Sequence, residues 1–152
     1  MRGQRGAATV EMAIAGTAFF LVLFAALEVG RLSYTMHGLT EATRRGARIA
    51  TVCPLDDPQI KNAATFHDPI SGAGGLIPVI TPDKVTLAYL DANGNSTATF
   101  LDIRYVRVSI VPITYTTIIP GAVMAFTLPA FSTTLPRESL GVPRDGVVEC
   151  AF

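Results

Sequence analysis

The amino-acid sequence predicts an α+β protein in which one long N-terminal helix packs against a small antiparallel β-sheet. Two observations support this fold class. Helical periodicity extends from about residue 7 to residue 52, and segments with β-like alternation, separated by turn residues, follow after residue 83. Two cysteines, Cys53 and Cys150, bracket the β-like part, which we therefore expect to form a head on the helix.

The helix begins with an apolar segment. Between Ala7 and Leu27 the only charged residue is Glu11. A helix of this length spans about 31 Å at 1.5 Å per residue, which matches a hydrocarbon core of about 30 Å. A removable secretory signal would have a shorter apolar stretch, and the core helix of a soluble protein would show a polar face. Both alternatives stay open, but the segment favours a retained transmembrane helix.

The helical pattern continues beyond the apolar segment as an amphipathic stalk. Apolar and small residues follow one another at steps of three and four and so share one stripe: Leu32, Met36, Leu39, Thr43, Ala47 and Ala50. Pro54 would end the helix. We expect one long helix, or two nearly collinear ones, with a bend allowed at a glycine, because each glycine weakens a helix by about 1 kcal/mol relative to alanine. The candidates are Gly30, Gly38 and Gly46.

The two cysteines bear on the compartment. Paired, Cys53 and Cys150 would close a loop of nearly a hundred residues, which requires an oxidising environment outside the cytoplasm. Two unrelated buried thiols remain the alternative. The arginines do not favour a cytoplasmic N-terminus, since Arg2 and Arg5 precede the apolar segment and four arginines follow it before residue 49. The cysteines favour that orientation instead.

The head is predicted to be mostly β-structure. Residues 54–83 are rich in proline, glycine, aspartate and alanine, and Ser71–Gly75 is expected to form a loop. Three or four antiparallel strands are expected at residues 85–90, 103–111, 113–119 and 130–135. A tight turn containing Asn93-Gly94 should follow the first strand, and Pro120-Gly121 and an apolar stretch at 122–128 should separate the last two.

Catalytic and metal-binding patterns are not found in the sequence. Four residues fit positions of a calcium-loop template, but Ser96 replaces the required glycine, and a hairpin turn fits better: Asp91, Asn93, Asn95 and Asp102. His37 and His67 have no acid or nucleophile nearby in sequence that recommends them. Twelve basic and twelve acidic residues balance, so no nucleic acid is indicated. We expect no enzyme activity, cofactor, metal or small-molecule substrate.

The N-terminal residues resemble a known processing motif. The segment Gly6-Ala7-Ala8-Thr9-Val10-Glu11, after a short basic stretch and before an apolar helix, resembles the prepilin peptidase site of the type IV filament superfamily. With residues 28–31 and 42–48, it is similar to the TadE-like pseudopilins of the bacterial tight adherence (Tad or Flp) pilus systems. The resemblance implies cleavage between Gly6 and Ala7, and a pilin-like division into a basic leader (1–6), a transmembrane and stalk helix (7–52) and an extracytoplasmic head (53–152).

The resemblance also explains the charge in the apolar segment. A carboxylate at the membrane centre costs about 2–3 kcal/mol, although Glu11 could reach the headgroups or be protonated. In the family, the glutamate is the fifth residue after cleavage, where it can neutralise the new amino terminus of a neighbouring subunit. Glu11 has that position if Gly6 is the last leader residue.

The resemblance implies a minor pseudopilin in assembly of a Tad pilus for surface adherence, since major Flp pilins are usually far shorter. Its expected partners are membrane lipid, a prepilin peptidase, other pilins or pseudopilins, and the Tad secretion machinery. It would cross the bacterial inner membrane once, with its C-terminal domain in the periplasm, and could join the pilus. The alternative is an uncleaved, membrane-anchored extracytoplasmic binding module that never enters a filament.

Overall fold

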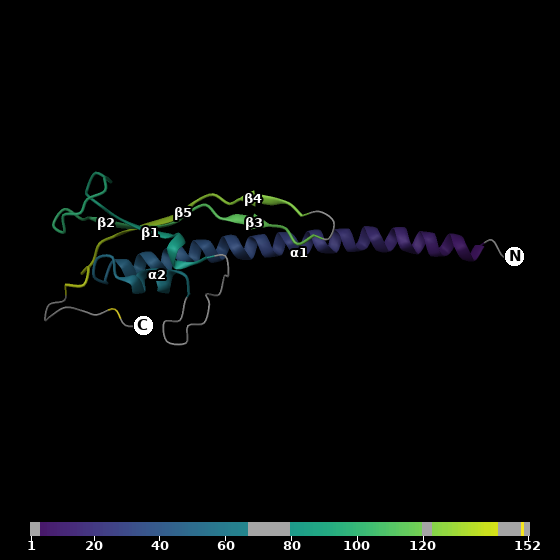
Figure 1. Cartoon of the computed structure of the whole chain (residues 1–152), viewed down its shortest axis with the longest axis horizontal. Coiled ribbons are helices and arrows are strands. Elements are labelled where there is room, and N and C mark those ends of the chain that lie inside the picture. Colours follow the sequence, from purple (N-terminus) through teal and green to yellow (C-terminus); the bar gives the residue numbers. More distant parts are fainter. Residues whose placement is uncertain (1–3, 67–79, 120–122, 143–149, 151–152) are drawn as a thin grey trace.

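The structure is a computed structural model that describes residues 4–66, 80–119, 123–142 and 150. One helix forms a rod along the whole length of the molecule, and the head packs against its C-terminal half (Figure 1). This arrangement of a long apolar helix and a small antiparallel sheet confirms the predicted α+β fold class. His67, the Ser71–Gly75 loop and Pro120-Gly121 lie outside the described residues.

Helix α1 (Gln4–Ala50) is continuous for 47 residues and ends two residues before the predicted boundary. All three glycines considered as bend sites lie inside it. Position 46 requires a glycine because of close packing: a Cβ atom there would lie 2.8 Å from the Cβ of Ala64 and 3.1 Å from Cγ1 of Val108. Glycine therefore lets α1 approach the rest of the head closely, at the expense of helix propensity.

The predicted stripe of the stalk is largely buried under the head. Leu39, Thr43, Ala47 and Ala50 are each at most 1% exposed. Met36 was expected to lie on this stripe, but it is 38% exposed, and the neighbouring Thr35 is buried instead. The buried face is centred on Ala42, Thr43, Gly46 and Ala47, whose small side chains let the sheet approach α1.

The segment after α1 contains two short helical elements that the sequence analysis did not predict. It contains helix α2 (Pro58–Ala64) and, before the sheet, the 3₁₀ turn η1 (Pro82–Lys84). Asp57 caps α2, since its Oδ1 accepts a hydrogen bond from the backbone N–H of Gln59 at 2.8 Å, and Pro58 occupies the first turn. Ile60 and Ala64 of α2 are fully buried.

The main sheet has three antiparallel strands, β1 (Val85–Leu90), β2 (Tyr105–Ile110) and β5 (Phe131–Pro136), in the order β1-β2-β5. In the register, Val85 faces Ile110 and Ile110 faces Phe131. Val106, Val108 and Ile110 all point into the core.

A second, two-stranded ribbon lies along α1 on the side nearer its N-terminal half (Figure 1). It consists of β3 (Thr114–Thr116) and β4 (Ala125–Thr127), paired so that Tyr115 faces Phe126. β3 is shorter than the predicted strand 113–119. β4 falls within the apolar stretch that was expected only to connect two strands, so that expectation was wrong.

The Asn93-Gly94 turn forms as predicted. Gly94 has a φ of 85°, and Oδ1 of Asp91 accepts hydrogen bonds from the backbone N–H groups of Asn93 and Asn95 at 2.8 and 2.9 Å. The turn returns only to a single bridge between Leu90 and Ser96, and β2 begins at Tyr105. It is therefore a local turn inside a longer connection.

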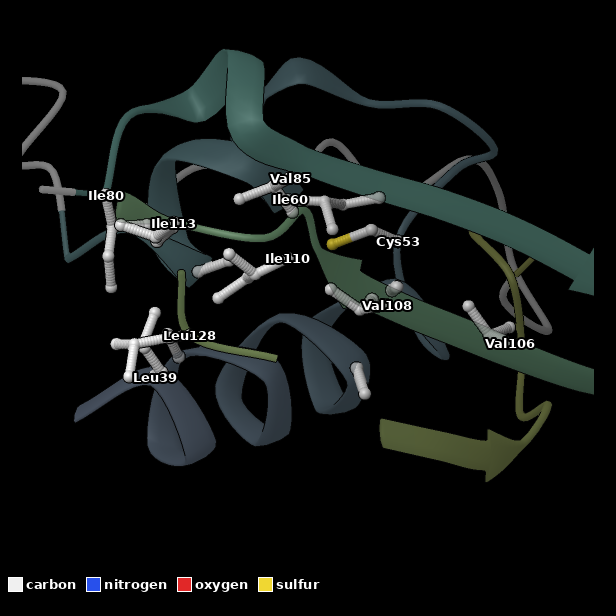
Figure 2. Packing of buried hydrophobic residues seen from close by; sticks show 14 of the residues in the cluster. Leu39, Cys53, Ile60, Ile80, Val85, Val106, Val108, Ile110, Ile113 and Leu128 are labelled. Atoms are coloured by element: carbon white, nitrogen blue, oxygen red, sulfur yellow. The ribbon is translucent and has the colours of Figure 1, made fainter. Parts of the chain in front are cut away.

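The core lies between α1, α2 and the sheet (Figure 2). Leu39 contributes from α1, Ile60 from α2, and Val85, Val108 and Ile110 from the strands, and each is at most 1% exposed. Ile113 and Leu128, which flank the ribbon, join the same cluster. The ribbon is thus attached to the core at its base.

The segment after β5 donates hydrogen bonds to the carbonyl groups just after the C-terminal end of α1. The last carbonyl groups of a helix lack partners within it. Here the carbonyl of Thr51 accepts hydrogen bonds from the backbone N–H groups of Glu138 and Leu140, and that of Val52 accepts one from Gly141 at 2.7 Å. Cys53 is fully buried and forms a disulfide with Cys150. The end of the stalk is therefore held by backbone hydrogen bonds and a covalent link.

Candidate membrane and assembly surface of helix α1

The N-terminal half of α1 projects beyond the head with its apolar side chains exposed (Figure 1). Its large apolar residues are between 38% and 74% exposed: Val10, Met12, Ile14, Phe19, Phe20, Leu21, Val22, Leu23, Phe24 and Leu27. Among the described residues, α1 is the one helix that is long and apolar enough to cross a membrane. Exposed apolar surface of this extent is stable in lipid and not in water, so the helix fits a single-pass membrane anchor.

The residues of the resembled processing motif lie at the far end of this helix. Gly6 and Ala7 are exposed and already helical, since α1 begins at Gln4. Glu11 is exposed one turn further on, and no hydrogen bond or ion pair to it occurs within the described part of the chain. The fold therefore keeps these three residues away from the head, and Glu11 can meet another molecule.

Glu28, the first charged residue after the apolar segment, binds the ribbon. Its Oε1 accepts a hydrogen bond from the hydroxyl of Tyr115 at 2.7 Å, and its Oε2 accepts one from the backbone N–H of Ile118 at 3.2 Å. Since both donors belong to β3 or the residues just after it, one carboxylate fixes the ribbon against α1. We call this contact the helix–ribbon junction and include Arg31 in it.

Arg31 completes the junction one turn after Glu28. Its Nη2 donates to Oε1 of Glu28 at 3.0 Å and to the carbonyl of Thr116, and its Nε donates to the Tyr115 hydroxyl at 2.9 Å. The guanidinium carbon also lies 4.7 Å from the centre of the Tyr115 ring. The charge of Glu28 is thus neutralised where the helix leaves its apolar segment.

Sequence reasoning did not find this junction. Glu28-Val29-Gly30-Arg31 was noted only for its resemblance to a family, and Tyr115 was placed in an ordinary strand. The available signal was the Glu–Arg pair three residues apart at the end of an apolar segment. The aromatic partner is 87 residues away in sequence, so spacing could not identify it.

Other residues considered from sequence lie apart from this surface. His37 is exposed on the stalk, and Oδ1 of Asp91 is used within its turn. Over the described ranges, no group of three or more histidine, cysteine, aspartate or glutamate side chains is placed to hold a metal ion. The described features of the surface are therefore its apolar helix, the free Glu11 and the helix–ribbon junction.

Comparison with known proteins supports the predicted resemblance. Residues 6–48 match the family model of TadE-like proteins, a stretch that contains the processing motif, the apolar segment and most of the stalk. No match was found among curated proteins or among solved structures. The TadE-like resemblance is thus confirmed for the N-terminal helix.

Proposed function

Because residues 6–48 match the TadE-like family, we propose that this protein is a minor pseudopilin that takes part in assembly of a Tad pilus. That match is the observation that carries the proposal. The exposed apolar half of α1 supports it, since a pseudopilin needs a helix that is stable first in lipid and then among other pilin helices. The role is structural rather than enzymatic.

In this proposal, α1 crosses the bacterial inner membrane once and the head lies in the periplasm. The disulfide between Cys53 and Cys150 supports this orientation, because such bonds persist in oxidising compartments. The leader would then be residues 1–6 on the cytoplasmic side, followed by the anchor and stalk to residue 52 and the head from residue 53. Partners of the helix are lipid, the prepilin peptidase, other pilins and the Tad secretion machinery.

Processing would remove the leader between Gly6 and Ala7. Both residues are helical, and a peptidase must open the helix locally to reach the bond. Gly6 makes such opening easier, since glycine is the least helix-stabilising residue after proline. The new amino terminus of Ala7 would carry a positive charge one helical turn from Glu11, so a small axial offset between parallel helices would bring it beside Glu11 of a neighbouring subunit.

Mass spectrometry of the full-length protein tests the processing step. Produced with active cognate prepilin peptidase, the protein should lose the mass of residues 1–6, and it should keep them without peptidase. Gly6→Leu should block the cleavage. Gly16→Leu is the matched control, because both glycines lie in α1 with open space where a side chain would extend. An uncleaved wild-type chain in the presence of active peptidase would refute the proposal.

The alternative function is an anchored binding module that never enters a filament. The free carboxylate of Glu11 separates the two, since a binding module would not need it. The pseudopilin proposal predicts that Glu11→Ala reduces the pili recovered by shearing from cells, whereas Glu41→Ala, an exposed carboxylate in the stalk of the same helix, leaves them unchanged. Equal pilus yield from both variants would favour the binding module.

A further inference from the structure

The β3–β4 ribbon ends in an exposed apolar tip. We define the ribbon tip as Ile118 and Ile119 on the β3 side and Val123 and Met124 on the β4 side. Ile118, Val123 and Met124 are 66%, 73% and 60% exposed. Large apolar side chains gathered at this exposure normally mark a surface that is covered by something else.

The ribbon also carries no charged side chains. From Val108 to Pro136 the sequence contains no aspartate, glutamate, lysine, arginine or histidine. Charged side chains are the residues that make an edge ribbon soluble and discourage its contact with apolar surfaces. Their absence over this whole stretch, which includes both ribbon strands, is compatible with a position in the membrane interface and costly in water.

The position of the tip along α1 indicates what covers it. The helix–ribbon junction holds Ile118 at the level of Glu28, the first residue after the apolar segment. Beyond Ile118, Ile119 lines the same hollow as Phe20, Leu21 and Phe24 of α1. The tip is therefore beside the last turns of the membrane-spanning segment, and any bilayer that surrounds these turns must also reach the tip.

Three backbone N–H groups in and next to the tip have hydrogen-bond partners within the protein, as a poorly hydrated environment requires. The N–H of Thr117 donates to the carbonyl of Met124 at 2.9 Å, and the N–H of Met124 donates to Oγ1 of Thr117 at 2.8 Å. The N–H of Ile118 donates to Glu28. These groups would each cost several kcal/mol in lipid if they lacked a partner. A two-stranded ribbon keeps open edges, which suits the interface and not the hydrocarbon centre.

We propose that the ribbon tip inserts into the membrane interface on the side of the head, next to α1, and gives the head a second contact with lipid. The protein then rests on the membrane at two points, the helix that crosses it and a wedge beside that helix. Lipid is the occupant because the tip continues the apolar surface of the anchor at the same level. This contact is independent of cleavage after Gly6 and of any pilus.

Tryptophan fluorescence tests the proposal directly, because the chain contains no tryptophan. The full-length protein is placed at one copy per lipid nanodisc with a single probe: Met124→Trp at the tip, Ile14→Trp near the middle of the apolar segment, or Asn93→Trp in the turn after β1. That turn lies at the opposite end of the head from the ribbon tip (Figure 1). Lipids brominated near the headgroup or deep in the chains report the depth of each probe.

Met124→Trp should emit at shorter wavelength than Asn93→Trp and be quenched more strongly by shallow than by deep bromine, whereas Ile14→Trp should be quenched more strongly by deep bromine. Val123→Trp provides the same measurement if Met124→Trp does not fold. A tip probe that behaves like Asn93→Trp would overturn the proposal. So would a blue shift that appears only with several copies per disc, because a second protein molecule would then cover the tip.

Discussion

The hydroxyl of Tyr115 donates a hydrogen bond to Oε1 of Glu28 at 2.7 Å and joins the ribbon to the helix across 87 residues of sequence. The same carboxylate oxygen accepts from Nη2 of Arg31, and Oε2 accepts from the N–H of Ile118. Glu28 thus holds three donors at the end of the apolar segment. Arg31 adds hydrogen bonds to Tyr115 and to the carbonyl of Thr116, so the position of the ribbon on α1 should depend on Glu28 and Arg31 together.

Removing the Tyr115 hydroxyl should loosen the ribbon without unfolding the head. In Tyr115→Phe the ring still packs on Phe126, but Glu28 loses one donor. We expect faster hydrogen–deuterium exchange at the N–H groups of Thr117, Ile118 and Met124, with little change in the main sheet. Tyr105→Phe, on the exposed face of β2, is the matched control. Unchanged exchange at the three ribbon amides would contradict this role of Tyr115.

The junction should also respond to alkaline pH. Burial, together with the hydrogen bond to Glu28, raises the pKa of the Tyr115 hydroxyl above its ordinary value of 10.0. A group whose pKa is raised on folding contributes stability that is intact below the unfolded value and lost as the pH rises through the folded value. Ribbon protection should therefore persist to pH 10 and decrease above it, because the phenolate would face the Glu28 carboxylate.

Alkaline absorbance titration measures this change. Tyr115 should ionise late, together with Tyr89, whose pKa is raised mainly by burial. The Tyr115→Phe variant should lose one late-ionising phenol and retain the other. If the variant loses an early-ionising phenol instead, Tyr115 is not protected by its partners in the folded protein.

The close approach at Gly46 predicts an unusual effect of alanine. Alanine favours a helix over glycine by about 1 kcal/mol. At residue 46, however, the added methyl group would meet Ala64 at 2.8 Å, and overpacking of this kind costs about 1–3 kcal/mol. We expect Gly46→Ala to lower the free energy of unfolding by about 1 kcal/mol in a denaturant titration followed by circular dichroism.

Gly30→Ala is the matched control for this substitution. It changes the same residue type in the same helix, but nothing lies within 4 Å of the added atom. Gly30→Ala should leave stability unchanged or raise it by up to about 1 kcal/mol. Equal effects of the two substitutions would show that α2 and β2 can move away from α1 without cost.

The disulfide should stabilise the head substantially. Cys53 and Cys150 are 97 residues apart, and closing a long loop typically contributes about 2–4 kcal/mol. The double variant Cys53→Ala and Cys150→Ala should melt at a lower temperature than the wild type. Dithiothreitol should lower the melting temperature of the wild type and not that of the variant. A wild type insensitive to the reductant would mean that the bond adds little.

The elements with strong local signals were predictable from sequence. The apolar and amphipathic periodicity placed α1 to within a few residues, and alternation predicted a strand over residues 103–111, which contains β2. Asn93-Gly94 identified a turn. Each of these depends on residues that are close together in the chain, which is what patterns in one sequence report.

The missed elements depend on distant contacts. Helix α2 is only seven residues long and is stable because Ile60 and Ala64 are buried against the core, although Asp57-Pro58 was a legible start signal. β4 is a three-residue strand defined by its pairing with β3. Met36 turned outward because the head covers the side of α1 that carries Thr35 and Ala42. The partner of Glu28 required the folded chain.

The unbroken helix α1 also determines how mechanical force would travel through the molecule. Tension applied to the projecting N-terminal half would first load the contact between Glu28 and Tyr115, and then shear α1 along the head over its buried face. At the far end, the disulfide at Cys53 and the hydrogen bonds to the carbonyls of Thr51 and Val52 would stop the helix from sliding out. Force applied to the helix would therefore reach the head through the buried face of α1 and the Cys53–Cys150 disulfide.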